Sequence, residues 1–306
     1  MIVQKAVTPQ VSSAYLYRCQ DSVSGYVTNA ADIHDVTTPS ALFSLLGLGF
    51  PGSSHRADAP YLDVLRFESN ELMTFTNAVG GHTAEEATAN DGPFVEHEPF
   101  NGLGFTAGGH PPVPLWFLDH CRLPPGAELW RAHADGQEEL LAVYQDVGLG
   151  WAGAHGPLPI ESRVLPSLMI GPLVKWQDVT WPADLLHDGD TVVLASAGEP
   201  PMGGFERSAR GYWRREVPLA EVGDYYDLRL TGTWRDARFR IVHRWEQSGQ
   251  IRVELFYIGR DANEAESLGL AKLDAGVYAG SAPISEITDV QGVQNTPSSL
   301  AAHAPQ

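Results

Sequence analysis

The stretch 225–259 constrains the fold most strongly, because apolar and polar residues alternate along most of its length. Successive side chains of a strand point to opposite faces of a sheet, so this alternation is typical of strands. The alternation is interrupted at Arg235-Asp236 and again at Ser248-Gly249, where turn-forming residues occur. The stretch therefore predicts three consecutive antiparallel strands, that is, a meander.

A second ordered element is predicted between Gly126 and Tyr144. Two alternating runs flank the pair Asp135-Gly136. Both residue types tolerate a positive φ, so an Asp-Gly pair in this setting is a strong signal for a β-hairpin.

Helices are expected to be few and short. One should begin at Pro39, because proline favours the first helical position. Another should span 261–270, with Asp261 as its N-cap and Gly269 near its end. Residues 14–18 are interpreted as a short strand.

Two other segments have no periodic pattern. Residues 77–112 are rich in glycine, threonine, asparagine and proline, and they should be largely irregular. Residues 294–306 are interpreted as a disordered tail.

The composition favours a β-rich α+β fold with mostly antiparallel sheets and few helices. Glycine (31) and proline (22) are frequent, which favours turns and short strands, and 43% of residues are hydrophobic, enough for a substantial core. We expect two closely packed parts, with the boundary somewhere in 148–172. The first, 1–155, is an acidic, glycine-rich α+β part that ends in the hairpin. The second, 156–306, is an antiparallel sheet with one packed helix and the tail.

The net charge of −18 is distributed unevenly. Residues 1–200 hold 24 acidic and 8 basic residues, whereas 207–260 hold 11 arginines and 7 acidic residues. One interpretation is that the two parts attract each other and pack. The other is that the acidic part repels nucleic acid and membrane surfaces and suits a basic protein partner.

The sequence also predicts the cellular compartment of the protein. No run of 18 or more apolar residues occurs, and the first ten residues lack the apolar core of a signal peptide. The two cysteines, Cys19 and Cys121, fit neither a disulfide framework nor a zinc pattern. These features predict a cytoplasmic protein with reduced thiols.

Two motifs are considered and rejected. Residues 47–52 match G-x-G-x-x-G, but a predicted helix precedes them where a nucleotide-binding fingerprint needs a strand. Asp119-His120-Cys121 places three possible metal ligands in a row. Adjacent side chains of an extended chain face opposite ways, so we predict no metal site there.

Glu96 and Glu98 form an E-x-E pair, whose carboxylates would lie on one side of an extended segment. Arg18 precedes the pair, and Thr74-Phe75-Thr76 lies between. This order resembles the NAD-dependent ADP-ribosyltransferases, which carry an early arginine, a Ser-Thr-Ser on a strand and then E-x-E. The resemblance covers roughly residues 14–145, with Thr-Phe-Thr in place of Ser-Thr-Ser.

The resemblance implies a role for each matching position. Arg18 would hold the phosphates of NAD, and the stretch 74–76 would shape the nicotinamide pocket. Glu98, with Glu96 as the other member of the pair, would stabilise the positively charged transition state.

A candidate binding surface is Tyr212-Trp213-Arg214-Arg215, because aromatic and arginine residues concentrate at interfaces. Two functions therefore remain open. The first is a non-enzymatic cytoplasmic protein-binding factor of immunity or accessory type, with an acidic surface and no cofactor. The alternative is an ADP-ribosyltransferase-like enzyme that uses NAD.

Overall fold

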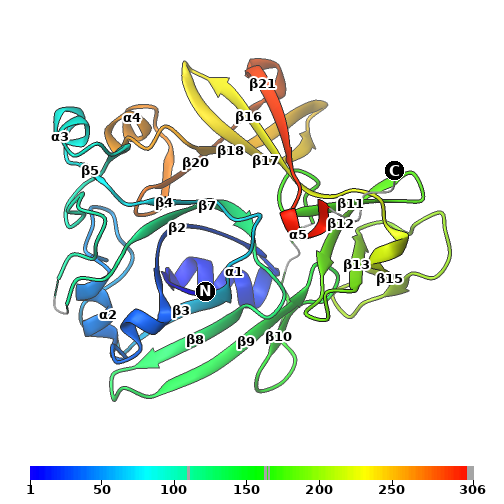
Figure 1. Cartoon of the computed structure of the whole chain (residues 1–306), viewed down its shortest axis with the longest axis horizontal. Coiled ribbons are helices and arrows are strands. Elements are labelled where there is room, and N and C mark those ends of the chain that lie inside the picture. The colour runs from blue at the N-terminus through cyan, green and yellow to red at the C-terminus, as the bar shows by residue number, and fades with distance from the viewer. Residues whose placement is uncertain (109–110, 162–163, 165, 302–306) are drawn as a thin grey trace.

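The computed structural model describes residues 1–108, 111–161, 164 and 166–301. Over these residues the protein has a β-rich α+β fold, built from two large sheets of antiparallel strands and a few short helices, of which α1 (Pro9–Arg18) lies among the strands of the first sheet (Figure 1). The predicted fold class is confirmed. The described helices are α1 (Pro9–Arg18), α2 (Pro39–Leu45), α3 (Ala84–Ala89), α4 (Ala262–Ser267) and α5 (Ser298–Ala301).

The first sheet has the strand order β10-β9-β8-β3-β1-β2-β7-β4. Its strands are β1 (Ile2–Val7), β2 (Ser22–Asn29), β3 (Tyr61–Glu68), β4 (Phe75–Asn77), β7 (Trp116–Arg122), β8 (Glu128–His133), β9 (Glu138–Asp146) and β10 (Gly150–Gly153). A separate parallel pair consists of β5 (Gly80–Gly81) and β6 (Phe94–Val95).

The second sheet has the order β14-β15-β13-β12-β11-β16-β17-β18-β20-β19, and β21 pairs with β16. Its strands are β11 (Pro172–Trp176), β12 (Val179–Leu185), β13 (Thr191–Ser196), β14 (Glu206–Arg207), β15 (Trp213–Pro218), β16 (Tyr225–Trp234), β17 (Ala237–Gln247), β18 (Gln250–Tyr257), β19 (Ala271–Asp274), β20 (Val277–Pro283) and β21 (Thr288–Asn295).

The elements with the clearest local patterns are confirmed. Strands β16, β17 and β18 form the predicted meander, and Arg235, Asp236 and Gly249 all adopt positive φ at its turns. Strands β8 and β9 form the predicted hairpin, with Gly136 at φ +84°. Helix α4 begins after its N-cap Asp261, as the sequence indicated.

The interpretation of residues 14–18 as a strand is wrong, because they end helix α1. Thr8 caps this helix by accepting a hydrogen bond from the backbone N–H of Val11, and Pro9 occupies the first turn. The spacing of Ser12 and Tyr15, both buried, places them on the covered side of the helix. The helical start signals therefore outweighed the short alternation of apolar residues.

Two segments are more ordered than predicted. Within 77–112, strands β5 and β6 and helix α3 form a compact unit, in which Gly80 of β5 packs directly on the Phe94 backbone of β6. The predicted tail is ordered at its start, where β21 ends at Asn295 and α5 follows. Residues 302–306 lie outside the described residues.

No helix in the described part of the chain is long and apolar enough to cross a membrane.

The core of the first sheet includes the middle of β7, where Leu118 is completely buried among Val27, Leu65 and Leu129. We expect Leu118→Ala to lower the free energy of unfolding by about 3 kcal/mol, because it removes buried apolar contacts and leaves a cavity. Urea denaturation followed by tryptophan fluorescence would measure this change. The control Leu103→Ala, at a position that is 63% exposed, should change stability by less than about 0.5 kcal/mol. A similar loss in both variants would contradict this placement of the core.

Candidate functional site

Strand β7 brings Asp119, His120, Cys121 and Arg122 to the boundary between the two sheets. Asp119 is buried and accepts hydrogen bonds from two arginines of the second sheet region, Arg229 on β16 and Arg260 just after β18. The Asp119 Oδ1–Arg260 Nη2 distance is 3.2 Å. One carboxylate therefore binds two guanidinium groups that lie more than 100 residues away in the sequence.

Arg122, at the end of β7, forms a fully buried ion pair with Asp184 of β12. The side chains of both residues are 1% exposed, and Arg122 Nη2 lies 2.9 Å from Asp184 Oδ1. Asp184 also accepts the backbone N–H of Val147 at 2.7 Å. Burial raises the pKa of Asp184 to about 6 against the opposing effect of Arg122, so the carboxylate is ionised at neutral pH.

A third contact joins Arg240 of β17 to both sheets. Its guanidinium donates to the backbone carbonyl of His120 and to Asp227 Oδ2, the latter at 3.2 Å. The His120 ring stacks on Phe256 with centroids 3.7 Å apart. Burial lowers the pKa of His120 well below its usual value, and the charge of Arg240 lowers it further, so His120 is neutral.

We call these residues the seam: Asp119, Arg122, Asp184, Asp227, Arg229, Arg240 and Arg260. The seam contains titratable groups from both sheets at hydrogen-bonding distance. In the part of the chain that the structure describes, no group of three or more His, Cys, Asp or Glu side chains is arranged to hold a metal ion. The contacts of the seam are ion pairs between arginines and buried carboxylates, in which Arg122 and Arg240 are buried as well.

A cavity of about 400 Å³ lies beside the seam, and Arg122, Asp184 and Asp227 contribute to its wall. The rest of the wall comes from the end of β3 and the loop after it, the loop after β7, the starts of β11 and β16, the end of β12 with the loop after it, and the segment around α5. Sequence reasoning missed this cavity, because its lining residues come from segments that show no common pattern.

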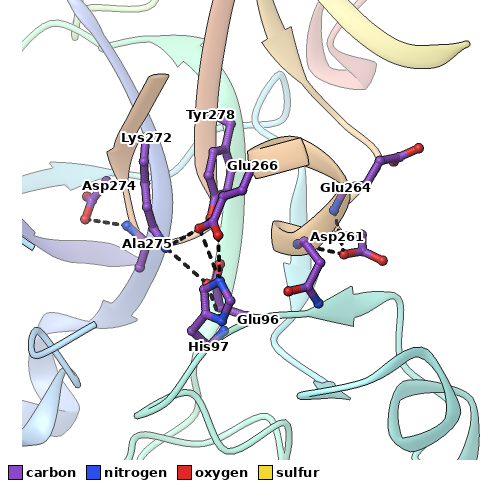
Figure 2. Close-up of polar contacts among 10 residues, drawn as sticks. Glu96, His97, Asp261, Glu264, Glu266, Lys272, Asp274, Ala275 and Tyr278 are labelled. Carbon is purple, nitrogen blue, oxygen red and sulfur yellow. Dashed lines mark hydrogen bonds and ion pairs between the residues drawn. The ribbon is translucent and has the colours of Figure 1, made fainter. Parts of the chain in front are cut away.

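Glu96, a predicted catalytic residue, belongs to a different cluster. Figure 2 shows it beneath β19–β20 and α4, near Lys272, Glu266 and Tyr278. Lys272 Nζ lies 3.6 Å from Glu96 and 3.4 Å from Glu266. The Tyr278 hydroxyl donates to Glu266 at 2.9 Å, and His97 Nε2 lies 3.1 Å from the same carboxylate. This network ties the segment after β6 to the second sheet.

The other two predicted catalytic residues lie in different surroundings. Glu98 is exposed, whereas Glu96 is 3% exposed, so the carboxylates of the E-x-E pair do not share one environment. Arg18 is exposed at the C-terminal end of α1. In the contacts described for these residues, Arg18 is not brought to Glu96 or Glu98.

The Thr74-Phe75-Thr76 stretch lies at the seam. The backbone carbonyl of Thr74 accepts the N–H of Asp119 at 3.0 Å, and its hydroxyl oxygen accepts from Arg229 Nη1 at 3.1 Å. Thr74 therefore helps to position the Asp119–Arg229 pair. Glu96 has its own polar partners, His97 and Lys272, elsewhere.

The predicted binding patch at 212–215 reaches the surface only in part. Tyr212 is buried and donates its hydroxyl hydrogen to the backbone carbonyl of Val164. Trp213 is half-buried. Arg214 is paired with Asp146 of β9 at 2.9 Å, and the Arg215 guanidinium lies over the Trp176 ring at 4.6 Å.

The four residues of the patch are therefore engaged mainly in packing within the chain. An alternating strand places successive side chains on opposite faces, which is why β15 cannot present adjacent residues as one surface.

Comparisons with known proteins give no relative. The chain matches no protein-family model, no curated protein and no solved structure.

The buried state of Glu96 predicts a pH effect on stability. Burial raises its pKa, which the His97 backbone N–H and Lys272 oppose. The Glu96 carboxyl therefore binds its proton more tightly in the folded protein than in the unfolded chain. The stabilisation is present below the usual carboxyl pKa and is lost as the pH rises through the raised pKa.

We expect Glu96→Gln, which stays neutral, to gain stability relative to the wild type as the pH rises from about 4 to about 7. Urea denaturation at several pH values would measure the difference. Glu98→Gln, at an exposed position, should change stability by less than about 0.5 kcal/mol. A loss of stability of Glu96→Gln relative to the wild type as the pH rises would show that burial does not raise the pKa of this carboxyl.

Proposed function

We propose that this protein is a non-enzymatic cytoplasmic protein-binding factor of immunity or accessory type, whose acidic surface binds a basic protein. The observation that carries the proposal is the internal use of the basic side chains of the second part. Arg229 and Arg260 pair with Asp119, Arg214 pairs with Asp146, and Lys272 pairs with Glu96. These cations neutralise buried carboxylates, so the second part adds less positive charge to the surface than its number of arginines suggests, although Arg235, Arg238 and Arg244 are exposed.

The acidic character is concentrated in the segment 67–121, which holds eight acidic residues and neither lysine nor arginine. Exposed carboxylates occur here on α3 and around it, including Glu85, Asp91 and Glu98. Figure 1 shows α3 beside α4, and Val95 forms a backbone bridge with Asp261 at the start of α4. The two short helices thus contribute carboxylates to one region of the surface, which favours a basic partner.

The cytoplasmic assignment is supported by the two cysteines. Cys19 and Cys121 are both buried free thiols. Thiols persist in reducing compartments, where disulfides are rare.

The experiment that tests the proposal is affinity capture with the immobilised protein at about 50 mM salt, where exposed charges are weakly screened. We expect a basic protein to be retained and to elute as salt increases. Binding of the purified partner would then be measured by calorimetry. The absence of any salt-sensitive basic partner would overturn the proposal.

The contribution of the α3 surface can be measured with the triple variant Glu85→Gln, Asp91→Asn and Glu98→Gln. Three lost charges of about 0.5 kcal/mol each should weaken partner binding about tenfold. Asparagine suits position 91, where φ is +54°.

A matched control removes three exposed carboxylates from the second part, at Glu199, Glu221 and Asp224. It should leave the affinity within about twofold of the wild type. Equal weakening by both triple variants would show that only the net charge matters, not the α3 surface.

The enzyme alternative predicts NAD binding, and we expect none. Millimolar NAD should leave the melting temperature unchanged, because a ligand raises it only when it binds the native state. Thermal denaturation with and without NAD would measure this. A saturable increase that disappears in Glu98→Gln and in Arg18→Ala would instead support the ADP-ribosyltransferase-like reading.

A further inference from the structure

The cavity beside the seam has the size of a small-molecule site. Its volume of about 400 Å³ falls within the range of roughly 300–1,000 Å³ that is typical of ligand pockets. Apolar side chains from distant segments meet in it, including Met73, Leu123, Leu186 and Leu300. Tyr225 adds an aromatic face to the wall. An apolar ligand body of moderate size fits such an interior.

The charged groups deep in the wall are already paired. Asp184 binds Arg122 at 2.9 Å, and Asp227 binds Arg240 at 3.2 Å. Arg122 is almost fully buried, and its Nε and Nη1 groups, which have no hydrogen-bond partner, are buried as well. Among the described residues that line the cavity, the interior therefore presents no exposed cation to an anionic ligand.

The mouth of the cavity is acidic. Glu68, the last residue of β3, and Glu71, on the loop after it, are both exposed and both line the cavity. Glu71 accepts hydrogen bonds from the backbone N–H and hydroxyl of Ser298 on α5, which lower its pKa and keep it ionised. His187 is the other titratable group of the rim. In all, four carboxylates line this cavity against one buried guanidinium.

We infer that this cavity binds a small organic cation, with its apolar body inside and its ammonium group at the mouth near Glu68 and Glu71. The apolar body of the ligand can occupy the interior without breaking an ion pair, because the charged groups in the wall are already paired with each other. The two mouth carboxylates attract the positive charge, and they lie in the part of the chain that lacks lysine and arginine. The inference does not depend on the protein partner proposed above.

The test uses three probes of one size that differ in charge: 3-phenylpropylamine, 3-phenylpropanol and 3-phenylpropionate. Titration calorimetry at about 20 mM salt would measure binding to the full chain. We expect the amine to bind at least about tenfold more tightly than the propionate, with the alcohol between them. Equal or tighter binding of the propionate, or no binding of the amine, would overturn the inference.

Variants of the mouth locate the site. Glu68→Gln should weaken amine binding about threefold and leave alcohol binding unchanged. The control Glu85→Gln, an equally exposed carboxylate on α3, should change neither. An amine that binds Glu68→Gln and the wild type equally would place its charge elsewhere and contradict the proposed orientation.

Two blocking variants test whether the ligand enters this cavity. Ser299→Trp adds bulk at an exposed lining position on α5, and Leu72→Trp does so at a half-buried one. Both should reduce amine binding more than tenfold, and melting curves would check that each variant is folded. Ser299 is exposed, so a folded Ser299→Trp variant provides the result even where Leu72→Trp fails to fold. Unchanged amine binding to folded Ser299→Trp would overturn the inference.

Discussion

The structure depends on buried ion pairs between the two sheets, most of them at strand β7. A charge removed from water is costly unless a partner of opposite charge and hydrogen bonds compensate it. The Asp119 carboxylate is compensated by Arg229 and Arg260. Arg122 is compensated by Asp184 of β12 and by the backbone carbonyls of Pro172 and Ala183, which also belong to the second sheet. If the sheets separated, each of these charged side chains would lose its partner of opposite charge and would either stay buried unpaired or become exposed to water. The seam therefore couples the packing of the first part to that of the second.

The same pairing explains the electrostatic character of the molecule. Arginines are numerous in the second part, yet several of them, such as the buried Arg240 and the half-buried Arg229 and Arg260, pair with carboxylates of their own chain. The exposed carboxylates of the segment 67–121 have no lysine or arginine in that segment to balance them. This arrangement supports a basic protein partner for the surface and a cationic small molecule for the cavity. The segment 67–121 contributes carboxylates to both regions and contains no lysine or arginine.

Local patterns predicted the fold where the signal is local. The meander, the hairpin at Gly136 and the cap at Asp261 each depend on neighbouring residues, and each was found. The site depends on contacts across more than 100 residues, such as Asp119 with Arg229, which no spacing rule contains. The patch at 212–215 was predicted from residue type alone, and burial of its tyrosine could not be foreseen without the neighbouring loop at Val164.

The most direct test of this account is a double-mutant cycle on Asp119 and Arg229, using Asp119→Asn, Arg229→Gln and the double variant. The free energy of unfolding of all four proteins would be measured by urea denaturation. The account predicts a favourable coupling energy of about 1–3 kcal/mol between the two residues and a single cooperative transition. A coupling energy below about 0.3 kcal/mol, or separate transitions for the two parts in the wild type, would contradict the claim that the seam holds the sheets together.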